Sequence, residues 1–263
     1  MWTSTFAIYP PLLTSLKEHF PDLKLDLELQ WGDPSTLRSS PLLHSLHVHF
    51  EPSKLNTVKT NPLLIHVQTQ IMDSPNLVEL SMEIGSLGCV IYDANPKFAR
   101  LKGKRFLLLE KLALEAFPLI VENVDYWMKS MDWSQIESLY FRAVDEPTYF
   151  FNESMKLMGG LLRLKVLRIE LPWLGETRDP QDFEDTFRRF LDVPHDAGLS
   201  EIALEGDYRP SLQAILDRHG ESLKKLQLHD PERPYEPHRE MLPEPELSDL
   251  GRRDPISRQF RST

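Results

Sequence analysis

One spacing of apolar residues recurs along this chain: an apolar residue, two variable positions, a second apolar residue, one variable position and a third apolar residue. The spacing fits eight times, and successive matches start 23 to 35 residues apart. The matches are Phe20/Leu23/Leu25, Leu43/Leu46/Val48, Leu77/Leu80/Met82, Leu109/Leu112/Leu114, Ile136/Leu139/Phe141, Leu164/Leu167/Ile169, Leu199/Ile202/Leu204 and Leu223/Leu226/Leu228. A repeat at such intervals predicts that short structural units stack side by side around one continuous core.

The segments between these matches carry apolar residues at helical spacing. They are residues 12–16, 63–71, 121–131, 155–161, 183–190 and 212–216. Three helix starts place a capping side chain before a proline, at Asn61-Pro62, Asn95-Pro96 and Asp179-Pro180, and Glu146-Pro147 adds a fourth proline start. The cap accepts from open N–H groups, and proline has a preset φ and no N–H to satisfy. Each predicted helix therefore precedes a predicted strand.

Alternation along a strand points the second and third apolar residues of the motif into the core, and the residues between and after them outward. Parallel stacking then aligns the outward residues in columns. We expect Glu83, Glu115 and Glu170 to make the sheet face acidic, together with Glu205. Tyr140, Arg142 and Arg168 form a basic, aromatic island between them. The candidate partner-binding residues are Glu83, Glu115, Tyr140, Arg142, Arg168, Glu170 and, in a loop after a strand, Trp173.

Composition narrows the class of protein. The chain has 263 residues, 41% of them hydrophobic and 27% charged, which is enough to bury a sizeable core. The formal net charge of -10 disfavours nucleic acid as a partner, because phosphate binding needs clustered Lys and Arg. No apolar stretch is long enough to predict a membrane span, and Pro10-Pro11 breaks any signal peptide. A single cysteine, Cys89, favours the cytoplasm or nucleus.

The chain divides at residue 230. We expect residues 1–230 to form the repeat domain. Residues 231–263 are rich in proline and charge and poor in large apolar residues, so they predict a flexible tail. The long interval between the third and fourth motifs predicts a loop excursion within residues 85–104, with a helix near residues 95–102.

The sequence contains no motif of catalysis or cofactor binding. There is no glycine-flanked serine elbow, no phosphate-binding glycine loop and no dinucleotide fingerprint. His44, His47 and His49 lie close together, and His47 and His49 have a spacing that zinc ligands use, but an exposed pair on the sheet face is favoured because there is no second cluster and no cysteine partner. His195 lies in a predicted turn, and Cys89 lies in an apolar run. We therefore expect no metal, no cofactor and no enzymatic activity.

Three segments resemble the divergent leucine-rich repeats of fungal F-box proteins: residues 39–46, 73–80 and, most specifically, 215–229. The resemblance covers roughly residues 10–230 as a pattern. It implies an α/β solenoid of horseshoe shape with about eight irregular repeats, parallel strands on the concave face and helices on the convex face. In that family an N-terminal F-box helix docks on a Skp-type adaptor of a cullin ubiquitin ligase, and the repeats capture the substrate.

The sequence departs from the family pattern at its start, since Met1 to Pro11 is too short to hold an F-box. The leading hypothesis is a monomeric, non-catalytic module that binds a protein partner on the concave sheet face. One alternative is the substrate-recognition part of an F-box-type ligase adaptor that lacks its F-box. An enzyme with an unrecognised site and a degenerating relic are two further alternatives.

Overall fold

The computed structural model describes thirteen stretches of the chain. They are residues 2–3, 10–29, 39–51, 62–85, 108–117, 119–142, 144, 147–157, 160–170, 180–193, 195, 198–206 and 209–229. Several sequence predictions lie outside these residues: Trp173, Cys89, the helix near residues 95–102 and the tail 231–263. The predicted caps Asn61, Asn95 and Asp179 lie outside them as well.

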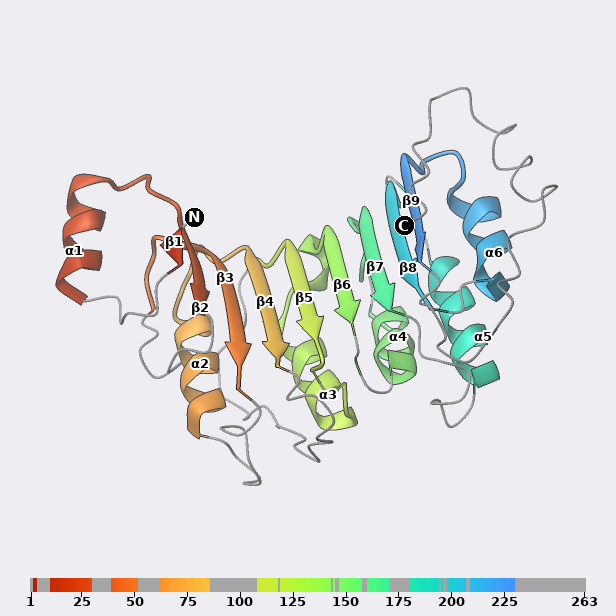
Figure 1. Ribbon diagram of the computed structural model, residues 1–263, viewed down its shortest axis with the longest axis horizontal. Coiled ribbons are helices and arrows are strands. Elements are labelled where there is room, and N and C mark those ends of the chain that lie inside the picture. The colour runs from red at the N-terminus through yellow and green to blue at the C-terminus, as the bar shows by residue number, and fades with distance from the viewer. Residues whose placement is uncertain are drawn as a thin grey trace, which may run out of the picture.

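The described strands form one nine-stranded sheet whose order follows the sequence (Figure 1). Every neighbouring pair is parallel. The strands are β1 (Trp2–Thr3), β2 (Leu25–Leu29), β3 (Leu43–Phe50), β4 (Glu79–Ile84), β5 (Lys111–Glu115), β6 (Ser138–Arg142), β7 (Val166–Glu170), β8 (Glu201–Glu205) and β9 (Lys225–His229). A sheet built in chain order with parallel neighbours requires a crossover after each strand, as a solenoid of repeating units provides.

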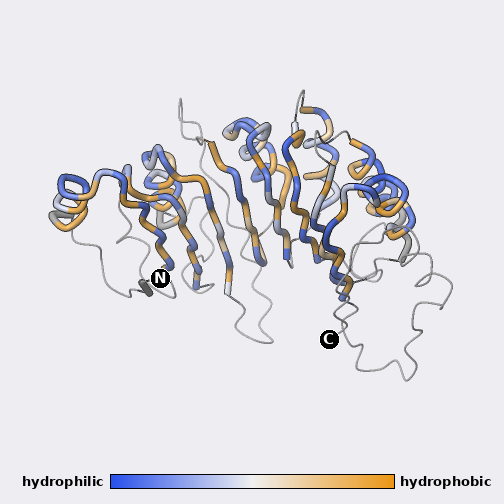
Figure 2. Tube along the Cα trace, turned by 90° about the horizontal axis from the view of Figure 1, so that it is seen from above, coloured by the Kyte–Doolittle hydropathy of each residue, from blue (hydrophilic) through white to orange (hydrophobic). Residues whose placement is uncertain are grey.

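Helices supply most of these crossovers. They are α1 (Pro10–His19), α2 (Pro62–Met72), α3 (Val121–Ser130), α4 (Pro147–Met155), α5 (Pro180–Leu191) and α6 (Arg209–His219), with the short 3-10 helix η3 (Trp133–Gln135) before β6. Helices α2, α4 and α5 begin at the predicted prolines. Figure 2 shows the helices as an arch along one side of the sheet, with the strands on its inner side. The fold is therefore α/β, with a single parallel sheet alternating with helices.

A repeated backbone contact links the units. The carbonyl of Val78 accepts from two successive N–H groups of the next unit, those of Glu110 and Lys111, at 2.8 and 3.0 Å. The carbonyls of four later residues do the same for the units that follow them. These acceptors are Glu110, Glu137, Lys165 and Ser200. The shared contact fixes how each strand enters the sheet, so the apolar motif keeps its register from unit to unit.

Two rows of apolar side chains line the covered side of the sheet. Strand register aligns Leu46 with Leu80, Leu112, Leu139, Leu167 and Ile202, and aligns Val48 with Met82, Leu114, Phe141, Ile169 and Leu204. All of these side chains are buried. Burying one aliphatic side chain of this kind contributes about 1.5–3 kcal/mol. The motif is thus the buried half of an alternating strand, as the sequence predicts.

Aromatic rings fill the space between β6 and the helices α4 and α5. Phe151 is fully buried, and its ring centroid lies 5.8 Å from Phe150, 5.5 Å from Phe187 and 4.7 Å from Phe190. Trp127 of α3 is buried as well, at 1% exposed. Tilted and edge-on ring pairs of this kind add stability beyond the area they bury.

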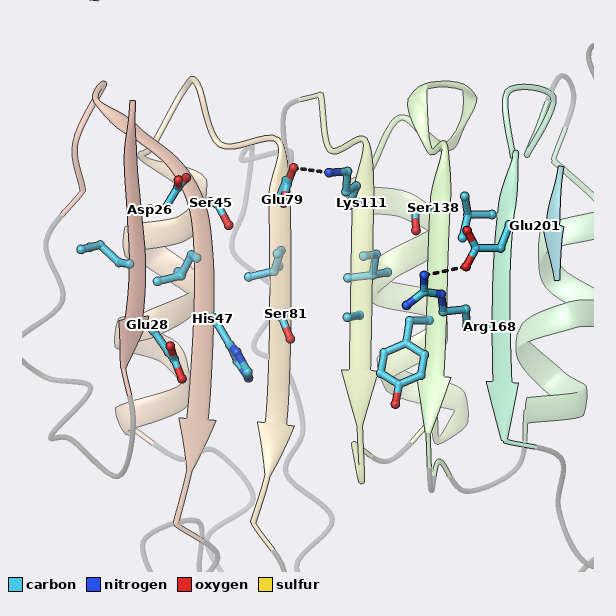
Figure 3. Close-up of a pocket in the computed structure, with 17 residues that line it drawn as sticks. Asp26, Glu28, Ser45, His47, Glu79, Ser81, Lys111, Ser138, Arg168 and Glu201 are labelled. Atoms are coloured by element: carbon cyan, nitrogen blue, oxygen red, sulfur yellow. Dashed lines mark hydrogen bonds and ion pairs between the residues drawn. The ribbon is translucent and has the colours of Figure 1, made fainter. Parts of the chain in front are cut away.

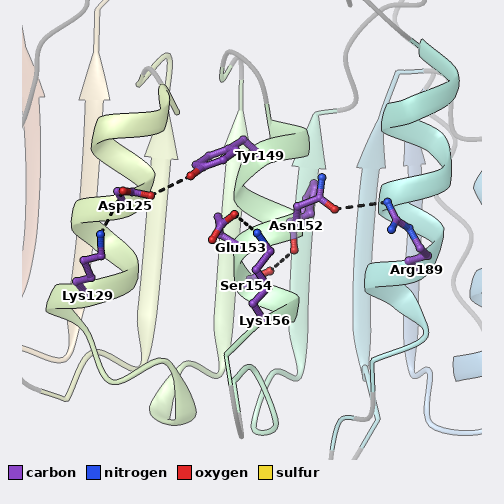
Figure 4. A network of polar contacts seen from close by, with 9 residues as sticks. Asp125, Lys129, Tyr149, Asn152, Glu153, Ser154, Lys156 and Arg189 are labelled. Atoms are coloured by element: carbon purple, nitrogen blue, oxygen red, sulfur yellow. Dashed lines mark hydrogen bonds and ion pairs between the residues drawn. The ribbon is translucent and has the colours of Figure 1, made fainter.

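Polar contacts join the helices on their outer side (Figure 4). The Tyr149 hydroxyl of α4 donates to Asp125 of α3 at 2.9 Å, and Arg189 of α5 donates to Asn152 of α4 at 3.4 Å. The bond to Asp125, with partial desolvation, raises the pKa of Tyr149 to about 12. These contacts connect three successive helices, α3, α4 and α5.

The structure corrects two sequence predictions. In the first repeat, Leu27 and Leu29 occupy the buried rows, because they pair with Leu46 and Val48, whereas Phe20 and Leu23 are exposed. The predicted register is wrong by four residues, since the run from Leu23 to Leu29 alternates throughout and fits several registers. The helix predicted over residues 155–161 is also wrong: α4 ends at Met155, and residues 160–163 form a turn.

Candidate binding face of the sheet

The side of the sheet that faces away from the helices is polar. Within the described residues no helix or strand covers it (Figures 1 and 2). Its outward side chains form three rows across the strands, defined by strand register. The first row is Asp26, Ser45, Glu79, Lys111, Ser138, Val166, Glu201 and Lys225; the middle row is Glu28, His47, Ser81, Ala113, Tyr140, Arg168, Ala203 and Gln227. The last row is His49, Glu83, Glu115, Arg142, Glu170, Glu205 and His229.

Six of the seven residues proposed from the sequence lie on this face. Tyr140 and Arg168 are neighbours in the middle row. Glu83, Glu115, Arg142 and Glu170 lie in the last row, on β4, β5, β6 and β7. Trp173 lies outside the described residues. The structure therefore brings the predicted residues together on four adjacent strands.

Arg142 is the centre of the last row. Its guanidinium lies 3.0 Å from a carboxylate oxygen of Glu115 and 3.6 Å from one of Glu170, so it bridges β5 and β7. The Glu115 carboxylate is the main reason that the pKa of Arg142 is raised above its ordinary value. The cation is thus already paired within the chain, and it holds two glutamates in place.

Histidines contact the glutamates toward both ends of the last row. Glu83 lies 3.0 Å from His49 and 3.5 Å from His47, and Glu205 lies 3.9 Å from His229. With neutral histidines, the row holds four carboxylates and one guanidinium. Counting the carboxylates and the guanidinium alone, the described part of the last row has three more negative than positive charges.

The first row contains two pairs of opposite charges on neighbouring strands. Glu79 pairs with Lys111, and Glu201 accepts from Arg168 of the middle row at 2.6 Å (Figure 3). Glu201 also accepts from Lys225 at 2.9 Å. Partial burial raises the pKa of Glu201, but the bonds from Lys225 and Arg168 outweigh burial and leave that pKa below its ordinary value. A carboxylate held in this way stays ionised and is suited to bind cations rather than to donate a proton.

A shallow hollow of about 540 Å³ runs over the first and middle rows from β2 to β8. Its lining includes four small side chains, Ser45, Ser81, Ala113 and Ser138. Longer charged side chains lie between and beside them, among them Glu79, Lys111 and Arg168 (Figure 3). The hollow is long and open, a shape that fits an extended or helical segment better than an enclosed small molecule.

Tyr140 borders both the hollow and the last row. Burial raises the pKa of its hydroxyl, and the nearby Glu115 carboxylate adds to the shift. The ring is half-buried, so it offers an aromatic surface with limited freedom to move. Tyrosine in such a position is a common anchor at protein interfaces.

Neither a metal site nor a membrane span is found in the described part of the chain. No group of three or more Cys, His, Asp and Glu side chains there is placed to hold a metal ion. His47 and His49 instead share the carboxylate of Glu83. None of the helices described has the length and hydrophobicity that crossing a bilayer requires.

The residues of the first row were not among the binding residues proposed from the sequence. Glu79, Lys111 and Glu201 precede the second apolar position of their motifs, and the period of two that places the other rows outward applies to them as well. That signal was present in the sequence. The pairing of Arg168 with Glu201 was not, since it depends on side-chain conformations across strands 33 residues apart in sequence.

A scan of protein-family models, a search of curated proteins and a search of solved structures each return no match to this chain. Proposals about function therefore rest on the geometry and charge of the sheet face.

Proposed function

We propose that this chain is a leucine-rich-repeat recognition module that binds a protein partner on the uncovered face of its sheet. One observation carries the proposal: a single parallel sheet is sealed by helices on one side and presents three ordered polar rows on the other. Stacked repeats of this kind create extended surfaces that suit protein partners. The single cysteine favours recognition in the cytoplasm or nucleus.

The shape of the face supports a macromolecular partner. The hollow crosses from β2 to β8, a width of about 30 Å at the usual strand spacing. A partner segment lying along it contacts side chains from several repeats at once. Many moderate contacts spread over such a distance give specificity without an enclosed pocket.

The test fills the hollow without changing its charge. Ser81→Gln combined with Ala113→Gln puts two longer neutral side chains into its lining. Thr148→Gln combined with Ala214→Gln makes a matched change on helices α4 and α6. Each tagged full-length chain is used for affinity capture from the native lysate, and bound proteins are quantified by mass spectrometry.

We expect the wild-type and helix-variant chains to retain the same partners, and the hollow variant to lose them by about tenfold, the result of about 1.4 kcal/mol of misfit. Thermal melting by circular dichroism checks that all three chains are folded. Equal capture by the hollow variant and the wild type would contradict the proposal.

The ligase-adaptor alternative comes from the resemblance to F-box proteins, and the same experiment tests it. Recovery of a Skp-type adaptor and a cullin with the wild-type chain would favour it. In that case the hollow variant should keep the adaptor but lose the substrate, because an F-box and a repeat array use different surfaces.

A further inference from the structure

We infer that the last row binds an arginine- or lysine-rich segment of a protein partner. The inference rests on the proposed function, because it assigns a chemical class to the partner of the same face. It starts from the uneven distribution of charge across the face. The first and middle rows together hold four acidic and three basic side chains, whereas the last row holds four glutamates and one arginine.

The excess of negative charge in the last row follows from the strand register. Glu83 and Glu115 are register neighbours on β4 and β5, and Glu170 and Glu205 are register neighbours on β7 and β8. Adjacent strands lie about 4.8 Å apart, so each pair brings two carboxylates close together. Arg142 pairs with the two inner glutamates, whereas Glu83 and Glu205 contact histidines. A cationic partner side chain would relieve the repulsion that remains in each pair.

Aromatic surface beside the acidic row points to the same chemistry. Tyr140 lies in the middle row next to Arg142, and its half-buried ring borders the row. A guanidinium can stack on such a ring while it donates to a carboxylate, and an ammonium can make a cation–π contact. Carboxylates with an adjacent ring therefore favour a basic segment over an acidic or a purely apolar one.

This geometry gives Arg142 a positioning role. It spaces Glu115 and Glu170 and lowers the negative charge of the row. If Arg142 itself captured an acidic partner, its loss would abolish binding. If the row captures a basic partner, replacing Arg142 by a neutral residue makes the row more acidic and strengthens binding. The two assignments thus predict opposite signs for one substitution.

The experiment measures fluorescence anisotropy of labelled peptides with the full-length chain. One probe consists of four Gly-Ser-Arg repeats, and the other consists of four Gly-Ser-Glu repeats. Titrations at about 50 mM and about 200 mM sodium chloride bracket physiological screening. We expect the arginine peptide to bind, the glutamate peptide not to bind, and the affinity to fall at the higher salt concentration.

Two variants test the row itself. Glu83→Gln combined with Glu205→Gln removes the glutamates that contact histidines, and should weaken the arginine peptide about fivefold, as the loss of two exposed ion pairs would. Arg142→Gln should strengthen it about twofold to threefold. Two matched controls make the same charge changes on the helices, far from the face. One combines Glu153→Gln with Glu184→Gln, and the other is Arg188→Gln alone. Both should leave affinity within about 1.5-fold of the wild type.

Three outcomes would overturn the inference: equal binding of both peptides, equal effects of face and helix variants, or weaker binding after Arg142→Gln. None of them would contradict the proposed function, which the uncharged hollow variant tests separately. The chain's own residues 251–263 contain four arginines and one aspartate. Peptide binding that occurs only in a chain ending at Leu250 would assign the row to this segment and overturn the choice of a separate partner.

Discussion

The two sides of the sheet are built from alternate residues of the same strands, yet they differ in almost every physical respect. The covered side is apolar and closed, with Leu139 and Phe141 of β6 fully buried. The uncovered side of the same strand carries the half-buried Tyr140 and the exposed Arg142, which pairs with glutamates on both neighbouring strands. Stability is concentrated on the covered side, because burial of apolar area outweighs exposed ion pairs.

This division separates the residues that stabilise the fold from those that the proposed recognition would use. A solvent-exposed ion pair contributes about 0–1 kcal/mol, whereas one buried aromatic side chain contributes several times as much. Residues on the uncovered face can therefore change with little cost in stability, while the motif residues cannot. The same argument explains why the apolar spacing recurs from β3 to β9 although the outward residues differ from one repeat to the next.

The largest effect is expected in the aromatic core. Phe151→Ala removes a ring that contacts Phe150, Phe187 and Phe190, and should lower the free energy of unfolding by about 3–5 kcal/mol. Phe20→Ala makes the same chemical change at a side chain that is 59% exposed, and should cost less than about 1 kcal/mol. Urea denaturation followed by circular dichroism compares the two. Similar losses would show that the covered side does not dominate stability.

We expect mild acidification to destabilise the fold mainly through two histidines that do not lie on the uncovered face. His195 lies between α5 and β8, and His219 is the last residue of α6. Their ring centroids are 5.8 Å apart, and they donate to the carbonyls of Leu161 and Leu191. Burial lowers the pKa of both imidazoles, and Arg218 lowers both further. Because the unfolded chain takes up these protons more readily than the folded chain, stability should fall as pH drops below about 6.5.

The pH effect is measured as the difference in unfolding free energy between pH 7.5 and pH 5.5. His219→Gln keeps a side-chain donor for the Leu191 carbonyl but cannot take up a proton, so it should reduce the difference. Glu137 and Glu201, whose pKa values are lowered, destabilise the fold only below about pH 4.5, outside this window. An unchanged difference in His219→Gln would remove this histidine from the explanation.

The sequence predicted the parts of this structure that depend on period and order. The motif places Leu112 and Leu114 in the core and Ala113 outward, and register then aligns the rows. It failed where period alone is ambiguous, as in the alternating run before Leu29. The pairing of Arg142 with two glutamates was also beyond prediction, since it needs the separation of β5 and β7 and the side-chain conformations.

The smallest effects should come from polar contacts on the two sides, and their ranking sharpens the comparison. Tyr149→Phe removes a hydrogen bond to Asp125 between helices and should cost about 1 kcal/mol. Arg168→Gln removes an exposed ion pair on the sheet face and should cost about 0.5 kcal/mol or less, because Glu201 keeps Lys225 as a partner. Thermal denaturation of both variants in the same buffer gives the order. A larger loss for Arg168→Gln would mean that the uncovered face also contributes to stability, and its rows could then vary less freely than the burial pattern indicates.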